Sequence, residues 1–322
     1  MKIINLYNIL IISFICLFFL GCSSSQVIDV SKQDQVDILL SKIGDTELKI
    51  STNEDIKKLI IESIVSLDSD IKISFVKKID AETLIISKDF LNQEFIYFCK
   101  SANEYLEEIT KKHLYSSYEN DEILIFYKQE FETHAKLIQS DFPGTKIFKL
   151  TDDYDDLVKK VFGLSGSYGR SNLINMLIQE NEVNFVPRPR NDFDKIYILA
   201  DYDQSKNFVP SLRFNYILNK EIFASSQSVT RIEDRKKLLD FSDLILSVPN
   251  SFIEQNNSTN LDKLSKISFI KDLIIISALK KNGFKSQMII GEFGNIRYSQ
   301  NACSDMSMNL VKVDNKGRFI KL

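Results

Sequence analysis

The sequence predicts an α/β protein that is built from two lobes with parallel sheets, and three observations support this fold class. Apolar runs typical of strands alternate with segments of helical periodicity, a pattern that indicates parallel βαβ units. Hydrophobic residues make up 44% of the 322 residues and charged residues 26%, as in globular proteins. This length favours two smaller lobes over one sheet of about ten strands, which stays the alternative.

Residues 1–21 are expected to be a lipoprotein signal peptide and not part of the fold. Residues 9–20 form an apolar run that is too short to cross a bilayer, which takes roughly 20 residues. The run ends in Phe19-Leu20-Gly21-Cys22, which resembles the cleavage motif of bacterial lipoproteins, with Phe19 where Leu is usual. The Cys22 thiol would then carry the lipid, and residues 22–34 would form a tether. A Ser after this cysteine favours delivery to the outer membrane, and an uncleaved anchor with an incidental cysteine is the alternative.

The remaining cysteines can be accounted for one by one. Cys16 leaves with the signal peptide and Cys22 is acylated, so only Cys99 and Cys303 stay in a compartment that permits disulfides. About 200 residues separate these two, and a sequence cannot show whether they come close in space. We expect two buried free thiols, with a disulfide as the alternative.

Apolar spacing places the strands and helices along the chain. Continuous or alternating apolar residues predict strands at residues 36–40, 71–75, 84–86, 95–98, 123–127, 146–150, 196–200 and 222–224, with short strands after 288. Apolar residues three and four apart predict helices at residues 51–67, 104–113, 131–138, 152–161, 208–216 and 261–279.

Two local features refine this assignment. Ser51 and Glu54 have the spacing of a capping box, which predicts the start of the helix that follows them. Between Phe75 and Leu84 there is no room for a crossover helix, because such a connection needs a dozen or more residues. The first lobe is therefore expected to be reduced.

The residues that usually carry chemistry are sparse. His113 and His134 are the only histidines, and no Cys or carboxylate lies at ligand spacing beside them, so we expect surface or capping histidines and no metal site. The acidic residues 152–156 lack the Gly and the final Glu of a calcium loop and are expected to be a solvated helix start. The glycines of residues 163–169 fit neither a P-loop nor a nucleophile elbow, so we expect a flexible loop there.

These absences exclude several classes of function. A formal net charge of −3 gives no basic field, which argues against a nucleic acid partner. No nucleophile with a neighbouring base can be nominated, so an envelope hydrolase is disfavoured. The sequence therefore predicts a binding or regulatory module that is not an enzyme and carries no cofactor.

Three segments in the middle of the chain have a specific pattern. Residues 187–200 read PRPRNDFDKIYILA, residues 212–214 read LRF, and residues 222–226 read IFASS. The pattern resembles the LppC family of lipoproteins, which activate penicillin-binding proteins from the outer membrane. Residues 170–178 fall where that family has a helix. Residues 277–294 resemble its final helix and glycine turn, with Phe293 in place of Thr.

The resemblance implies a type I periplasmic-binding-protein-like fold for residues 35–322. Lobe 1 would comprise about 35–117 plus part of the C-terminal region, and lobe 2 about 118–245. The chain would be a short form without the N-terminal helical-repeat domain of long members. Its partner would be a bifunctional peptidoglycan synthase, reached from the periplasmic face of the outer membrane. The alternative is a solute-binding lipoprotein that takes an amino acid or a similar small ligand.

The charged turn before residue 195 is expected to be structural. Arg188 or Arg190 can pair with Asp192 and Asp194 through charge-assisted hydrogen bonds, and these pairs would fix the loop that enters the following buried strand. A solvated turn is the alternative. The resemblance assigns no catalytic role to these four residues.

Overall fold

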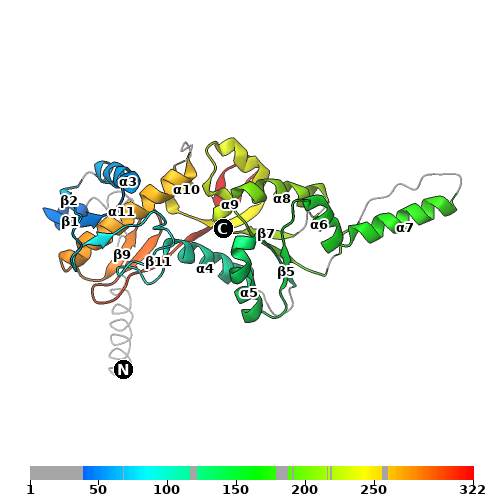
Figure 1. The fold of residues 1–322 in the computed structure, drawn as a ribbon, viewed down its shortest axis with the longest axis horizontal. Helices are drawn as coiled ribbons and strands as arrows, with labels where there is room; N and C mark the ends of the chain where they lie inside the picture. The colour runs from blue at the N-terminus through cyan, green and yellow to red at the C-terminus, as the bar shows by residue number, and fades with distance from the viewer. Residues whose placement is uncertain are drawn as a thin grey trace, which may run out of the picture. The chain divides into compact units, whose positions relative to one another are not determined.

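The computed structural model describes residues 39–67, 69–116, 122–178, 188–190, 192–215, 217, 220–255 and 260–322 (Figure 1). All of them belong to one compact unit, residues 36–322. The signal peptide, Cys22 and the tether lie outside the described residues. None of the helices that the structure describes combines the length and the apolar composition that crossing a bilayer requires.

The first lobe contains a three-stranded parallel sheet in the order β2-β1-β3. Its strands are β1 (Thr46–Ser51), β2 (Ile71–Phe75) and β3 (Leu84–Ile85). Helix α3 (Glu54–Val65) connects β1 to β2, and its N-cap is Asn53, whose side chain accepts a hydrogen bond from the Ile56 N–H. The predicted capping box at Ser51 is therefore wrong. No helix connects β2 to β3, so the lobe is reduced as expected.

The start of this lobe differs from the prediction. We expected a strand at residues 36–40, but residues 39–43 are helical and Gly44 follows them in the left-handed region. The strand that the prediction missed is β1. It carries Leu48 and Ile50 inward between polar residues, and three of its six residues are only partly buried or exposed polar groups. An alternation this short is easily mistaken for a loop.

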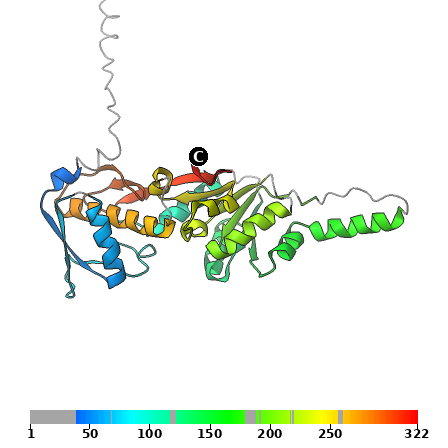
Figure 2. The same cartoon turned by 90° about the horizontal axis from the view of Figure 1, so that it is seen from above.

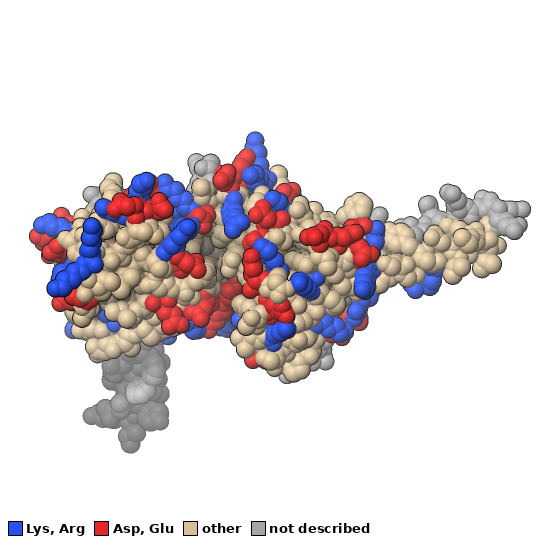
Figure 3. Space-filling view, in the orientation of Figure 1, with Lys and Arg blue, Asp and Glu red and all other residues tan. Residues whose placement is uncertain are grey.

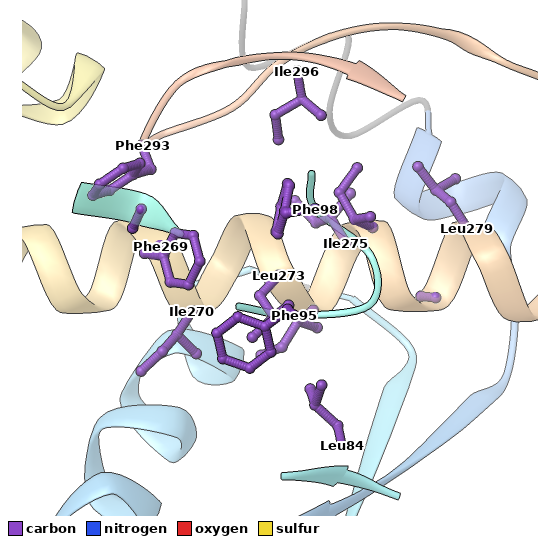
Figure 4. Close-up of a cluster of buried hydrophobic side chains, with 14 of the residues drawn as sticks. Leu84, Phe95, Phe98, Phe269, Ile270, Leu273, Ile275, Leu279, Phe293 and Ile296 are labelled. Carbon is purple, nitrogen blue, oxygen red and sulfur yellow. The ribbon is translucent and has the colours of Figure 1, made fainter. Parts of the chain in front are cut away.

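A second, antiparallel sheet belongs to the same lobe, and a long helix lies between the two sheets. The sheet has the order β11-β10-β9, with β9 (Gln287–Ile290), β10 (Asn295–Tyr298) and β11 (Asp305–Ser307). Figure 4 shows Ile296 on one side of helix α11 (Leu261–Lys281) and Leu84 on the other.

The predicted strand at residues 95–98 is wrong. These residues form a turn, and Phe98 makes only an isolated bridge to Ser304. Their apolar character comes from packing, because the rings of Phe95 and Phe98 lie 5.8 and 5.7 Å from that of Phe269 on α11. A short apolar run does not distinguish a strand from a buried turn.

The second lobe is one seven-stranded sheet in the order β13-β12-β8-β7-β6-β4-β5. Its strands are β4 (Ile123–Tyr127), β5 (Lys146–Lys149), β6 (Lys195–Leu199), β7 (Glu221–Ala224), β8 (Leu244–Val248), β12 (Asn309–Val313) and β13 (Phe319–Lys321). The neighbours from β5 to β8 pair in parallel, whereas β12 and β13 are antiparallel. Every residue of β4, β6 and β8 is buried, as in a parallel sheet that is covered on both faces.

Helices cover both faces of this sheet (Figures 1 and 2). They are α4 (Ala102–Leu114), α5 (Glu132–Asp141), α6 (Tyr154–Val161), α8 (Tyr202–Phe214), α9 (Gln227–Thr230) and α10 (Asn250–Glu254), with 3-10 turns η1 (Gln129–Phe131) and η2 (Arg235–Phe241). Helix α7 (Leu164–Leu177) follows α6 and extends away from the sheet. The side chain of Asp153 caps α6, so the acidic residues 152–156 are a helix start as expected.

Two helices run from one lobe into the other. Helix α4 places Tyr105 and Leu106 in the core of the first lobe and Leu114 in that of the second. Helix α11 places Leu261 in the second lobe and its residues from Phe269 onward in the first. The chain therefore has the two-lobed α/β fold with parallel-rich sheets that the sequence predicts.

Residues 163–169 are not the flexible loop that we expected. Gly163 adopts a left-handed conformation with φ 72°, which ends the turn after α6, and α7 begins at the next residue. Two further glycines, Gly166 and Gly169, lie inside α7. Glycine is a poor helix former, and this is why composition predicted a loop.

Cys99 and Cys303 form a disulfide, so the expectation of two buried free thiols is wrong. Their Cα atoms lie 5.0 Å apart, and both residues are exposed. The backbone next to them explains the proximity. Cys99 N–H donates to Ser304 O and Ser304 N–H donates to Tyr97 O, which holds the two distant segments side by side.

Candidate functional site

A pocket of about 650 Å³ lies between α4 and α5, and most of its lining residues are polar. It is placed where ligands enter α/β proteins, beyond the carboxyl ends of parallel strands, since η1 follows β4 and Gln227 follows β7. The lining residues are Asn92, Lys100, Ser101, Asn103, Glu104, Glu107, Glu108, Lys111, Glu130, Phe131, Thr133, His134, Leu137 and Gln227.

The floor of the pocket is a carboxylate that the protein itself binds. Glu107 of α4 accepts a hydrogen bond from the hydroxyl of Tyr197 on β6, and a second one, 2.5 Å long, from the hydroxyl of Ser225 after β7. Tyr197 is fully buried, and this burial together with the Glu107 charge raises the pKa of its phenol well above 10.0. The phenol therefore stays protonated and remains a donor. Glu107 thus connects α4 with two neighbouring strands of the second lobe.

Two basic side chains stand on the wall beside Glu107. Burial lowers the pKa of Lys111, although the nearby Glu107 carboxylate opposes this shift. Burial also lowers the pKa of His134, and the positive charge of Lys111 lowers it further. His134 is therefore neutral at pH 7. Its Nε2 atom is buried and has no hydrogen-bond partner among the described residues.

The two histidines have different surroundings. His113 lies on the surface of α4, as expected, with its Nδ1 atom 3.0 Å from Ile109 O. His134 is half-buried in the pocket wall, so the expectation of a surface or capping residue is wrong for it. Sequence spacing missed this position because Lys111 and Glu107 come from another helix.

The rim of the pocket is fixed by hydrogen bonds within the protein. Ser101 and Glu104 form a capping box at the start of α4, in which Glu104 accepts from Ser101 N–H at 2.8 Å. Asn103 donates to Asn92 at 2.7 Å, across two elements. The arrangement is a rigid polar recess with donors and acceptors. Within the described residues no group of three or more His, Cys, Asp or Glu side chains could hold a metal ion.

The charged turn before β6 is held by Arg190. Its guanidinium donates two hydrogen bonds to Asp192, and its Nη2 atom lies 3.4 Å from a carboxylate oxygen of Glu122. Its backbone N–H donates to Phe162 O at 2.8 Å. The structure thus brings Arg190 and Asp192 together and ties both to the start of β4 and to the end of α6.

The other two residues of the turn are placed differently. The carboxylate of Asp194 pairs with Lys220 at 3.6 Å rather than with an arginine, and it is 58% exposed. The backbone of Asp194, and not its side chain, connects the turn to its neighbours, because its N–H donates to Glu122 O and its carbonyl accepts from Glu221 N–H. Arg188 is exposed, and no hydrogen bond or ion pair connects it to Asp192 or Asp194 in the described part of the chain.

A buried carboxylate that the sequence analysis did not single out holds the glycine turn after β9. Asp272 of α11 is fully buried and accepts hydrogen bonds from the N–H groups of Glu292, Phe293 and Gly294. Burial raises its pKa to about 7, although these three donors favour the charged form. A Cβ atom on Gly291 would overlap this carboxylate, so only glycine fits there. The sequence did contain a signal for this residue, because Asp272 is an acidic residue inside the apolar run of a predicted helix.

The chain has a two-lobed α/β fold with parallel-rich sheets. No family model matches the chain, and no curated protein matches it. Similar solved structures include the C-domain of LpoA from Haemophilus influenzae, described as a regulator of PBP1A. It shares 12% identity over 94% of this chain and 91% of that one, with a TM-score of 0.45.

Two further solved structures are similar to the same extent. Full-length LpoA from H. influenzae aligns at 12% identity and a TM-score of 0.46, over 94% of this chain and 53% of that one. An extracellular ligand binding receptor from Desulfohalobium retbaense aligns at 9% identity and a TM-score of 0.44, over 86% and 59%. These neighbours are regulators and binding receptors, and the likeness concerns the fold alone.

Proposed function

We propose that this chain is an outer-membrane lipoprotein that binds and activates a bifunctional penicillin-binding protein. The observation that carries the proposal is the sequence pattern of residues 187–200, 212–214 and 222–226. These three segments, separate in the sequence, form one structural unit. β6 and β7 are adjacent parallel strands, with Ile196 opposite Ile222.

The arginine of the middle segment belongs to the same unit. Arg213 in α8 donates to the carbonyl groups of Asp240 and Ser242, which closes the helix against the end of η2. Burial lowers its pKa, but a guanidinium stays charged at every physiological pH. The pattern that resembles the LppC family therefore describes a coherent half of the second lobe and not scattered matches.

One structural feature supports a protein partner over a trapped solute. The pocket carboxylate, Glu107, already receives hydrogen bonds from Tyr197 and Ser225, so it is a weak site for the ammonium group of an amino acid. Membrane attachment would come from the acylated Cys22.

The alternative, a solute-binding lipoprotein, is favoured by one observation. The recess holds about 650 Å³, within the usual range for small-ligand sites, and His134, whose buried Nε2 atom has no hydrogen-bond partner among the described residues, is one of its lining residues. Such a receptor would place the polar group of its ligand against His134 and Gln227.

One pair of experiments separates the two functions. The chain with its lipid anchor, used as bait in a detergent extract of the cell envelope, should capture a peptidoglycan synthase and raise its glycan-polymerising rate after purification. A thermal-shift screen against amino acids and small carboxylates should show no stabilisation, because a ligand that binds only the folded state would raise the melting temperature. Stabilisation without capture would favour the receptor instead.

The lipid anchor has its own test. Cys22→Ser should abolish metabolic labelling with a radioactive fatty acid and leave an uncleaved precursor. Cys16→Ser is the matched control and should be labelled as the unchanged chain is. Labelling that persists in Cys22→Ser would contradict the anchor without affecting the synthase interaction.

A further inference from the structure

Helix α7 ends in a concentration of exposed apolar side chains. Leu177 is 81% exposed, Met176 75% and Leu173 62%, and Ile174 and Ile178 are close to half exposed. Only three residues of α7 are buried, Leu164, Ser167 and Ser171. The helix therefore packs against the described body through its first two turns, and its last turns are left uncovered.

The exposed residues form one face. At 100° per residue, Leu173, Ile174, Leu177 and Ile178 lie on one side of the helix, and Asn172 lies on the opposite side. We call these four residues the α7 face. Met176 flanks it. An apolar stripe at this spacing is the side of a helix that packs against another helix or a groove.

The α7 face carries no charge. Residues 171–178 contain no ionisable side chain. The only ones in α7 are the phenol of Tyr168 and Arg170, and Arg170 lies on the same side as Leu173 and Leu177, one turn before the face begins. In Figure 3 the described part of this helix is drawn almost entirely in tan, whereas blue and red groups are spread over the rest of the visible surface. A helix that inserts at a membrane surface carries Lys and Arg on its polar side, whereas the polar side here is asparagine.

We propose that the α7 face pairs with the same face of a second copy of this chain, as two antiparallel helices across a two-fold axis. In such a dimer each residue near the axis meets its own copy, so a charged face would repel itself and an uncharged one does not. The absence of charge on residues 171–178 is the condition that this geometry requires.

The available area fits a weak dimer. The exposed side chains offer on the order of 500 Å² per copy, the size of patch that marks an interaction site. A pair would bury on the order of 1,000 Å², which is the lower limit for a specific interface. We expect a dissociation constant on the order of 10–100 µM, so the dimer forms where the chain is concentrated.

Sedimentation equilibrium of residues 36–322 tests the proposal. This unit folds on its own, since it contains all three hydrophobic clusters. The unchanged chain should show a reversible monomer–dimer equilibrium. Leu177→Glu should raise the dissociation constant at least about tenfold, because it places two like charges in the interface. Asn172→Glu adds the same charge to the opposite side of the same helix and should change the constant by less than about twofold.

Disulfide trapping tests the geometry. Cys99 and Cys303 are bonded to each other, and residues 36–322 contain no other cysteine. Under mild oxidation Leu173→Cys should therefore give covalent dimers, and Asn172→Cys should stay monomeric. Three results would overturn the proposal. They are a monomer up to about 1 mM, a dimer that Leu177→Glu leaves unchanged, and binding of α7 to phosphatidylglycerol vesicles by a chain that stays monomeric.

Discussion

The hydroxyl of Tyr197 donates a hydrogen bond to the carboxylate of Glu107, and this bond joins an interior strand of the second lobe to the helix that arrives from the first. Ser225 donates to the same carboxylate at 2.5 Å. A partly buried carboxylate that loses a donor is left with one hydrogen bond fewer, so the bond should contribute to stability.

The first prediction concerns this bond. Tyr197→Phe should lower the free energy of unfolding by about 1–3 kcal/mol, because Glu107 then keeps only the Ser225 donor. Urea unfolding followed by circular dichroism measures the change. Tyr127→Phe on the neighbouring strand β4 is the matched control, since no hydrogen bond joins its hydroxyl to a described residue, and it should cost less than about 0.5 kcal/mol. Equal losses in the two variants would show that the bond contributes nothing beyond burial of the ring.

The second prediction concerns Asp272 and pH. Its pKa is raised from 3.8 to about 7 in the folded protein, so the folded state holds this proton more tightly than the unfolded chain does. Protonation of Asp272 therefore contributes to the free energy of unfolding. This contribution is fully present below pH 3.8 and is lost as the pH rises through 7. The advantage of the unchanged chain over Asp272→Asn should therefore fall by on the order of 2–3 kcal/mol between pH 5 and pH 8.

Comparing the two chains at each pH cancels the titration of all other groups. Unfolding by urea at both pH values gives the two differences directly. A difference that stays the same from pH 5 to pH 8 would mean that the three N–H donors keep Asp272 ionised throughout, and the prediction would be wrong.

The third prediction concerns the disulfide. Replacing both Cys99 and Cys303 by Ser should lower the free energy of unfolding by about 2–5 kcal/mol, because a bridge across 204 residues restricts the unfolded chain. The unchanged chain treated with a reductant should lose the same amount. Thiol titration of unreduced, unfolded residues 36–322 should find no free thiol. A full complement of two thiols would contradict the bond.

The fourth prediction separates two residues of the charged turn. Arg190→Ala should lower the free energy of unfolding by about 1 kcal/mol, because it removes contacts to both Asp192 and Glu122. Asp194→Ala should cost less than about 0.5 kcal/mol, because its carboxylate is 58% exposed and meets only Lys220. A larger loss of stability in Asp194→Ala than in Arg190→Ala would mean that the Asp194 side chain holds the turn, as the sequence analysis expected.

Some strands with continuous apolar runs were predicted from the sequence, whereas β8, which is buried along its whole length, was missed. Residues 123–127 were predicted to the residue, because a parallel strand that is buried on both faces has no polar interruption. β1 was missed because its inward residues alternate with Glu47 and Lys49, although it is the central strand of its sheet. Residues 95–98 were misread because a buried turn and a buried strand share one composition.

The candidate site was less predictable than the fold. Its key contact joins residues 90 positions apart, and no spacing rule connects Glu107 to Tyr197. The same holds for Cys99 and Cys303, which meet through a backbone pairing at Ser304. Asp272 could have been found, because a carboxylate in an apolar helical run must be satisfied by buried donors. A sequence can indicate that a single residue of this kind needs a partner. Which residue is the partner becomes clear only when the fold brings distant segments together.

The two helices that pass between the lobes make the joint stiff. Binding receptors close on a solute by bending a few extended residues, whereas α4 and α11 would have to break internal hydrogen bonds to flex. A stiff joint keeps the angle between the lobes constant whatever occupies the recess at Glu107. Scattering profiles of this protein should therefore not contract on loading with a small molecule. Force applied to the first lobe would travel along α4 to Glu107 and on to the strands of the second.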